Sequence, residues 1–417
     1  MRVLWLGDAG CHTGFARVTH SIGERLVSTF GHDVHVLATN YDGDFVDTPL
    51  KLYRPTTKLP TDVYGTSRFL EMLLKVQPDV VIVLNDAHIV LRFLFQNPWD
   101  EKRILLRHRP IVAYIPVDGT NVPATWSLIP KVVDPVVMCE FGRTAFPGAP
   151  VVYHGIDTSV YHPLSEGPIR ASNGQLVRTK SEAKQIFGYD PDRFLVLRVD
   201  RNSMRKNYVD TWHALQPVMD KYSDIDVHFH CVPKDESDLI LVASRNQSTK
   251  TRFFYPGDVN TFRGWPEENL AILYNAADAF VSTSWGEGFG LTLLEAAACG
   301  TPIVAQAASS IPEVVGEGGI LIEPERRFTV YAGVDMALPN VTAFSQAIER
   351  LYLSKGLRRE LGAKGASHAK SFSWDVAAER FDALIGDAAT RPSKEVTDAD
   401  LGGEVQDLLG TSEGVPE

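Results

Sequence analysis

The chain has 417 residues, of which 44% are hydrophobic and 22% charged, so it can form two hydrophobic cores and does not have the composition of a disordered or fibrous protein. Its formal net charge is -11, which excludes a general attraction to nucleic acids or anionic lipids but leaves room for a local basic groove. Nucleic acid is therefore not indicated as a partner.

The charge is unevenly distributed along the chain. Residues 390–417 contain seven acidic and two basic residues among glycine, serine, threonine and proline. Such a segment cannot bury enough apolar surface to offset the cost of ordering its backbone, so we expect a disordered tail.

Several features favour a cytoplasmic protein. The four cysteines are far apart and lack a C-x-x-C pair, which is typical of a reducing compartment. No apolar run approaches the about 18 residues of a membrane-spanning helix. Met1 leads directly into the apolar segment 2–7 without a signal peptide, so we expect no stable membrane insertion.

Short apolar strands alternate with amphipathic segments in the first part of the chain. Phe15, Val18, Ile22 and Leu26 form a helical stripe between the first two strands. This alternation predicts a parallel α/β sheet. The expected strands are residues 2–7, 33–38, 79–84, 110–115 and 134–139.

A second series of strands predicts a second doubly wound α/β domain. The polar segment 162–182 reads as a linker, so we place the domain boundary near residue 165, with domains at 1–165 and 166–373. A last helix is expected at 374–389. The second series of strands comprises residues 193–199, 226–231, 252–255, 279–284, 302–305 and 319–323.

Residues 285–301 carry the most informative pattern. Glu287 falls in a glycine turn between a strand and an apolar helix, and Glu295 follows inside that helix among leucines and alanines. Such a turn exposes backbone N–H groups and the positive end of the helix dipole, which favours an anionic ligand. A carboxylate at position 295 needs hydroxyl partners, and the vicinal diol of a sugar supplies two.

These residues resemble a known enzyme family. The segment 287–305 is similar to the E-x7-E signature of retaining nucleotide-sugar glycosyltransferases of family 4, and 197–215, 309–324 and 154–163 resemble further family segments in the expected order. The resemblance implies the GT-B fold, in which two Rossmann-like doubly wound domains face each other across an interdomain cleft. It also implies that the helix 374–389 packs back on the N-terminal domain.

The resemblance assigns roles to several residues. Glu295 would bind the ribose hydroxyls of a nucleoside-diphosphate sugar, while Glu287 and the turn Gly288, Phe289, Gly290 and Leu291 would contact its sugar and phosphate. Arg201 and Lys206 would hold the diphosphate, whose negative charge grows as the sugar leaves. Arg198 and Arg205 read as surface or packing residues. Ser309 and Ser310 precede a further helix and serve either as caps or near the sugar.

The N-terminal domain is less informative. A glycine-rich loop follows the first strand, and the resemblance implies that Gly14 lies over the donor phosphate. Its spacing is not G-x-G-x-x-G, which disfavours a dinucleotide-dependent dehydrogenase. Asp118 stands roughly where many family members carry a histidine, and it either orients a sugar hydroxyl or acceptor or caps the following segment.

The predicted activity is retaining transfer of a hexosyl or related sugar to a hydroxyl of an unidentified acceptor. The D-x-D pairs 190/192, 224/226 and 398/400 lie at a turn, a strand start and the tail, so we expect neither a metal nor another cofactor. A sugar-nucleotide epimerase, a sugar-phosphate-utilising synthase and a non-enzymatic nucleotide-sugar-binding protein are the alternatives.

Overall fold

The computed structural model describes residues 1–55, 64–65, 68–95, 109–245, 252–257, 264–391 and 394. The chain forms two compact units. The first contains residues 1–117, 122–153 and the chain from 374 onward, and the second contains 118–121 and 154–373. The change from the first unit to the second thus lies at 153/154, whereas the sequence placed it near 165. Most of the predicted tail, from 395 to 417, lies outside the described residues.

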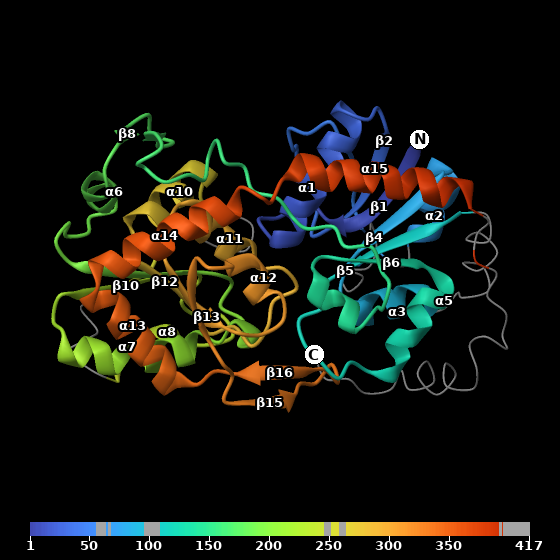
Figure 1. Ribbon diagram of the computed structural model, residues 1–417. Coiled ribbons are helices and arrows are strands. Elements are labelled where there is room, and N and C mark those ends of the chain that lie inside the picture. The colour runs from blue at the N-terminus through green and yellow to red at the C-terminus, as the bar shows by residue number, and fades with distance from the viewer. Residues whose placement is uncertain are drawn as a thin grey trace. The chain divides into compact units, whose positions relative to one another are not determined.

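The first unit is built on a parallel sheet of six strands (Figure 1). The strands follow the spatial order β3-β2-β1-β4-β5-β6, so the order reverses between β1 and β4. β1, β4 and β5 are almost entirely buried, as expected of parallel strands covered on both faces. Their bounds are β1 Arg2–Asp8, β2 Asp33–Thr39, β3 Lys51–Tyr53, β4 Val80–Leu84, β5 Ile111–Ile115 and β6 Asp134–Val137.

Helices from distant parts of the sequence cover this sheet. The C-terminal helix α15 packs beside α1, and its Phe381 ring lies 5.7 Å from Trp5 and 5.0 Å from Tyr114. Residues 374–390 therefore complete the core of the first unit. The helical segments of this unit are α1 Gly14–Ser28, α2 Phe69–Val76, α3 Ala87–Phe95, η1 Ala124–Leu128, α5 Ile129–Val132, η2 Glu140–Thr144 and α15 Trp374–Thr390.

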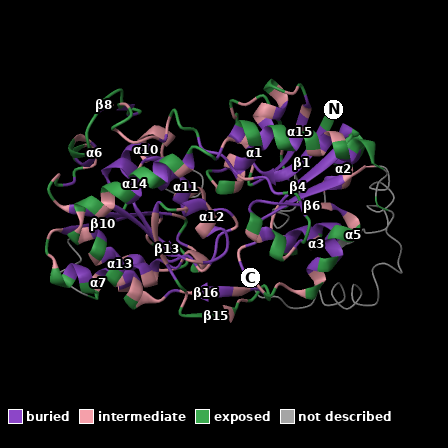
Figure 2. Ribbon diagram, viewed as in Figure 1, coloured by how far each residue is buried: buried purple, intermediate pink, exposed green. Residues whose placement is uncertain are grey.

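The second unit repeats the same topology. Its sheet has the order β11-β10-β9-β12-β13-β14, again entirely parallel, and the order reverses between β9 and β12. Buried residues concentrate in its central strands β9, β10, β12 and β13 (Figure 2). Each strand that the sequence predicted has a counterpart: β9 Phe194–Val199, β10 Ile225–His230, β11 Phe253–Phe254, β12 Ala279–Ser282, β13 Ile303–Gln306 and β14 Gly319–Ile322.

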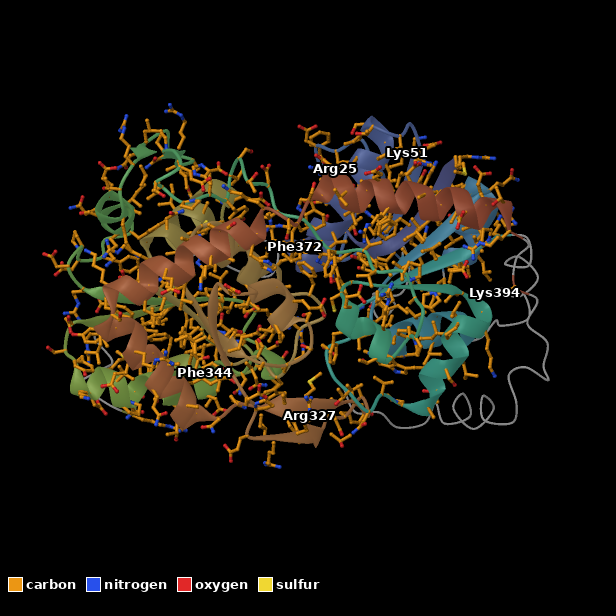
Figure 3. All side chains as sticks on the ribbon, in the orientation of Figure 1. Arg25, Lys51, Arg327, Phe344, Phe372 and Lys394 are labelled. Carbon is orange, nitrogen blue, oxygen red and sulfur yellow. The ribbon has the colours of Figure 1, made fainter. Side chains whose placement is uncertain are left out.

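The helices of the second unit enclose a core in which Phe344 of α13, labelled in Figure 3, joins Val196, Trp212 and Phe229. The prediction of two Rossmann-like doubly wound domains is thus confirmed. The helical segments are α6 Lys180–Ile186, η3 Met204–Lys206, α7 Tyr208–Lys221, α8 Leu239–Ser244, α10 Glu267–Ala276, α11 Leu291–Ala298, α12 Ile311–Val315, α13 Val341–Leu353 and α14 Lys355–Ala369.

Two small hairpins were not predicted. The segment interpreted as a linker contains β7 (Ile169–Arg170) and β8 (Leu176–Val177), and β15 (Arg326–Thr329) pairs with β16 (Asp335–Leu338) after the last core strand. Strands of two to four residues are too short to show a clear hydrophobic period. No helix in the described part of the chain combines the length and apolar character that crossing a bilayer requires.

Candidate functional site

The candidate site lies where the strand order of the second sheet reverses. In open parallel α/β sheets, ligands bind beyond the carboxyl ends of the strands at this point, because the two flanking loops turn away from each other there. Here the loops are residues 200–207, which follow β9, and 283–290, which follow β12. The sequence had singled out both segments.

Glu287 and Lys206 meet at this edge. Lys206 Nζ lies 2.8 Å from Glu287 Oε1 and 2.9 Å from Oε2, and also 2.6 Å from Asp200 Oδ1. Arg205 approaches the same carboxylate, with Nη1 3.3 Å from Glu287 Oε2, and donates to the carbonyl of Gly286. The Glu287 carboxylate is thus held by two cations from the neighbouring loop.

The cations determine the protonation state of Glu287. Burial alone would raise its pKa, since only 5% of the residue is exposed. The charges of Lys206 and Arg205, together with hydrogen bonds to the carboxylate, outweigh burial and lower the pKa to about 2. At neutral pH Glu287 is therefore an ionised acceptor of hydrogen bonds and not a proton donor.

Serines that follow β13 fix the backbone of the Glu287 turn. The N–H of Glu287 donates to Ser309 Oγ at 2.7 Å, and Ser310 Oγ is within 2.8 Å of the carbonyl of Glu287 and 2.7 Å of that of Phe289, to which it donates. Ser310 precedes α12 but makes no capping hydrogen bond there. Its hydroxyl therefore serves the Glu287 turn, a role that the sequence did not assign.

The turn residues named from the sequence lie at the start of α11. Gly290 has φ = +103°, a conformation that residues with a Cβ rarely adopt, and it stands directly before the helix that begins at Leu291. Gly288 is partly exposed beside it. The Phe289 ring is instead buried, 4.4 Å from that of His154, so only its backbone can serve a ligand at this turn.

Arg198 contacts both loops, although the sequence indicated only a packing or surface position for it. Its fully buried guanidinium donates to the carbonyl of Lys206 in one loop and to Thr283 Oγ1 (3.0 Å) and Ser284 Oγ (3.2 Å) in the other. It also lies 3.5 Å from Asp200 Oδ2 and 4.4 Å from the Tyr208 ring. A buried cation with this many acceptors fixes the separation of the loops.

Glu295 occupies a separate position within α11. It is 3% exposed, and its Oε2 accepts a hydrogen bond of 2.7 Å from the hydroxyl of Tyr274 on α10. Burial raises the pKa of Tyr274 well above its usual value, and the neighbouring Glu295 carboxylate adds to this effect. Tyr274 therefore stays protonated and can orient one oxygen of Glu295.

Arg201 does not join Lys206 at Glu287. Its side chain is 64% exposed, with Nε 3.4 Å from Asp235 and Nη2 3.8 Å from Glu236. Arg205, which the sequence indicated as a surface or packing residue, takes the place beside Glu287. Only the fold reveals this exchange, because Arg201 precedes the 3-10 turn Met204–Lys206, whereas Arg205 lies within that turn beside Lys206.

Asp118 is part of this cluster. Residues 118–121 belong to the second unit, although residues 117 and 122 belong to the first. Asp118 Oδ2 lies 3.4 Å from Arg205 Nε, opposite the contact of Arg205 with Glu287. Gly14, by contrast, belongs to the first unit, where it begins α1 after Thr13.

Histidines and carboxylates form no metal-binding group of three or more within the described residues. His228 and His230, which alternate on β10, are buried. His228 Nδ1 lies 2.5 Å from the Tyr189 hydroxyl, and the His230 ring packs 4.5 Å from Trp265. Asp226 of one D-x-D pair forms an ion pair with Arg193 at 2.8 Å, and the pair 398/400 lies outside the described residues.

Comparison with known proteins finds a family match over the region that contains this site. The family described as glycosyl transferases group 1 matches residues 193–353, which run from β9 to α13 and include the loops that carry Lys206 and Glu287. The switch point, the Glu287 turn and Glu295 all lie within this matched region.

Curated relatives align with part of the chain. O-antigen chain mannosyltransferase B of Escherichia coli is 29% identical over 227 residues, 47% of this chain and 55% of that protein. D-inositol 3-phosphate glycosyltransferase of Streptomyces griseus is 38% identical over 244 residues, 55% of this chain and 46% of that protein. The chain thus spans about half the length of these relatives, one of which is named for the O-antigen chain and the other for D-inositol 3-phosphate.

Solved structures extend the likeness to nearly the whole chain. The crystal structure of Anabaena Alr3699/HepE in complex with UDP-glucose superposes with a TM-score of 0.63, covering 93% of this chain and all of that one (100%) at 16% identity. At this identity the likeness shows the fold alone. The protein has the GT-B fold, with two Rossmann-like units, as the resemblance implied.

Proposed function

We propose that this protein transfers a sugar from a nucleoside-diphosphate sugar to a hydroxyl group of an acceptor, with retention of the anomeric configuration. The observation that carries the proposal is the cluster of Glu287, Lys206 and Arg205 at the switch point of the second sheet, inside the region that matches the family described as glycosyl transferases group 1. The complex of Alr3699/HepE with UDP-glucose supports a nucleotide sugar as donor.

The cluster offers the groups that such a donor needs. As the bond to the sugar breaks, negative charge develops on the departing diphosphate, and positive groups placed in advance stabilise it. Lys206 and Arg205 are positive groups at this edge, beside the turn before α11. When a donor binds, these cations would contact phosphate oxygens in addition to their carboxylate partners.

The carboxylates would bind the sugar and ribose hydroxyls. Ionised Glu287 can only accept hydrogen bonds, which suits hydroxyls of the transferred sugar. Glu295, oriented by Tyr274, would accept from the ribose hydroxyls. Asp118 would contact the sugar from the other side of Arg205, and Gly14 of the first unit would approach the donor phosphate.

Retention would follow from attack on the face of the sugar that the diphosphate leaves, with a diphosphate oxygen accepting the proton of the acceptor hydroxyl. The enzyme would then act by positioning and charge stabilisation. Arg205 and Lys206 would neutralise the diphosphate without a metal ion. The protein would act in the cytoplasm on a hexosyl or related donor.

The first experiment asks for no acceptor. We expect one class of nucleoside diphosphate to raise the melting temperature in a panel of nucleotides and nucleotide sugars. The stabilised protein should release the nucleoside diphosphate from the matching sugar donor, with turnover unchanged by EDTA. NMR of the product should show the anomeric configuration of the donor. An isomerised donor without nucleotide release would identify an epimerase. Donor binding without turnover, whichever acceptor is added, would identify a binding protein.

A further inference from the structure

The β15–β16 hairpin has one exposed strand and one strand that contacts the rest of the second unit. Its outer strand carries the exposed Arg326 and Arg327, the latter labelled in Figure 3, and Tyr331 at its tip is 93% exposed. Its other side makes specific contacts within the second unit. Val334, Met336 and Ala337 are the buried residues of this hairpin, so its buried side faces the rest of the second unit while its outer strand is exposed.

The hairpin holds the segment 118–121 by its backbone. The N–H of Thr120 donates to the carbonyl of Asp335 at 2.9 Å, and the N–H of Asp335 donates back at 2.8 Å. Asn121 Nδ2 donates to Asp335 Oδ2 at 2.6 Å. Gly119 fits against this strand because it lacks a side chain, since a Cβ there would lie 2.5 Å from both the carbonyl oxygen of Asp335 and Val334 Cγ1.

The same hairpin also holds the turn that carries Glu287. The N–H of Ala337 donates to the carbonyl of Trp285 at 3.0 Å, and the Trp285 ring packs edge-on against Phe328, with centroids 4.8 Å apart. The N–H of Trp285 in turn donates to the carbonyl of Arg205 at 2.9 Å. β16 thus lies between the Glu287 turn and the segment 118–121.

The segment 118–121 also contacts the Glu287 turn directly. A Cβ on Gly286 would lie 1.8 Å from the carbonyl oxygen of Asp118, so the two backbones touch directly. The guanidinium of Arg205 contacts Asp118 on one side and Gly286 and Glu287 on the other. Moving the segment 118–121 would therefore move Arg205 relative to Glu287.

We propose that the β15–β16 hairpin is a positioning element for the donor site, which orders the segment 118–121 and thereby sets the arrangement of Asp118, Arg205 and Glu287. Its catalytic consequence rests on the proposed function. Gly119 and Asp335 are positioning residues, because they would act on the site through the contact between the segment and the hairpin. If the hairpin were loosened from the segment, Arg205 would lose its alignment in the site, whereas Glu295 would keep its contacts with the nucleotide.

The test loosens the hairpin from the segment. Gly119→Ala places a Cβ against Asp335, whereas the matched control Gly356→Ala adds a Cβ on α14 that meets nothing within 4 Å. Hydrogen exchange of the full chain without substrate should accelerate about fivefold or more in Gly119→Ala at Thr120 and Asp335, and also at Trp285 and Glu287. Gly356→Ala should match the wild type at all four positions.

Turnover supplies the second readout. In Gly119→Ala, kcat for donor cleavage should fall about tenfold or more, while the Kd for the nucleoside alone, which Glu295 would hold without Arg205, stays within about twofold. A merely structural role would change both or neither. If Gly119→Ala does not fold, Asp335→Ala takes its place. This variant removes a partly exposed carboxylate that accepts from Asn121 and Thr329, and it should have the same effect to a smaller degree.

Faster exchange confined to Thr120 and Asp335, or an unchanged kcat, would overturn the inference. A wild-type protein that cleaves no nucleotide sugar would instead refute the proposed function. The exchange experiment would still decide whether the hairpin controls the Glu287 turn.

Discussion

The two units share one strand order but differ in the loops that leave their central strands. After β1, the buried Asp8 accepts hydrogen bonds from Thr13 and from the N–H of Gly10 (3.2 Å), with Cys11 Sγ 3.3 Å away. After β9, Asp200 instead faces Lys206 and Arg198. In the first unit a carboxylate with neutral partners thus stabilises the loop, whereas in the second unit a network of opposite charges occupies the same place in the topology.

The difference shows how a repeated scaffold acquires one reactive edge. A carboxylate whose partners are hydroxyls and amides stabilises a loop, whereas carboxylates that share cations can release those cations to an anionic ligand. In the second unit, Lys206 serves both Asp200 and Glu287. We therefore expect substitution of Lys206 in the second unit to affect chemistry far more than substitution of Asp8 in the first.

The largest expected effect concerns the buried cation of the second unit. Arg198→Leu should lower the free energy of unfolding of this unit by about 3–5 kcal/mol, because it removes one of the two cations beside Asp200 and takes a donor from several buried acceptors. Hydrogen exchange of the β9 amides measures this loss. The exposed Arg170 on β7 provides the control, and Arg170→Leu should change the stability by less than about 0.5 kcal/mol. Equal effects of the two substitutions would contradict a loop-joining role for Arg198.

The next effect separates the two units by activity. Lys206→Ala should lower kcat for donor cleavage about 100-fold or more, because one of the cations that would face the departing diphosphate is lost. Asp8→Asn, which changes the carboxylate at the end of β1 in the first unit, should retain kcat within about threefold. The exposed Lys355 controls for the loss of a lysine, so Lys355→Ala should behave as wild type. A loss in Asp8→Asn as large as in Lys206→Ala would mean that both loops share the chemistry.

The smallest effect is a pH dependence of stability. The pKa of Glu287 is lowered from 4.5 to about 2, so its ionisation stabilises the folded state fully above pH 4.5, and this stabilisation is lost as the pH falls toward 2. Wild type should therefore lose about 2 kcal/mol relative to Glu287→Gln between pH 6 and pH 3, by the linkage of about 1.4 kcal/mol per pKa unit. Urea unfolding of both proteins at each pH measures the difference. A constant difference would show that Lys206 and Arg205 do not hold the carboxylate.

Much of the fold was predictable because it depends on local patterns. The alternation of apolar strands and amphipathic helices located the strands of both central sheets except β3, which has only three half-exposed or exposed residues. The short hairpins escaped for the same reason. Their stability comes from partners distant in the sequence, such as Thr120 for Asp335.

The sequence by itself determined the two parallel sheets, the glycine turn with Glu287 and the buried position of Glu295, because each depends on residue types within one or two adjacent elements. The tertiary structure alone decided that Arg205 and not Arg201 faces Glu287, that Ser310 holds the turn, and that Asp118 belongs to this cluster. These outcomes depend on side-chain directions and on contacts between residues about 20 to 90 positions apart, which a local hydrophobic pattern does not encode.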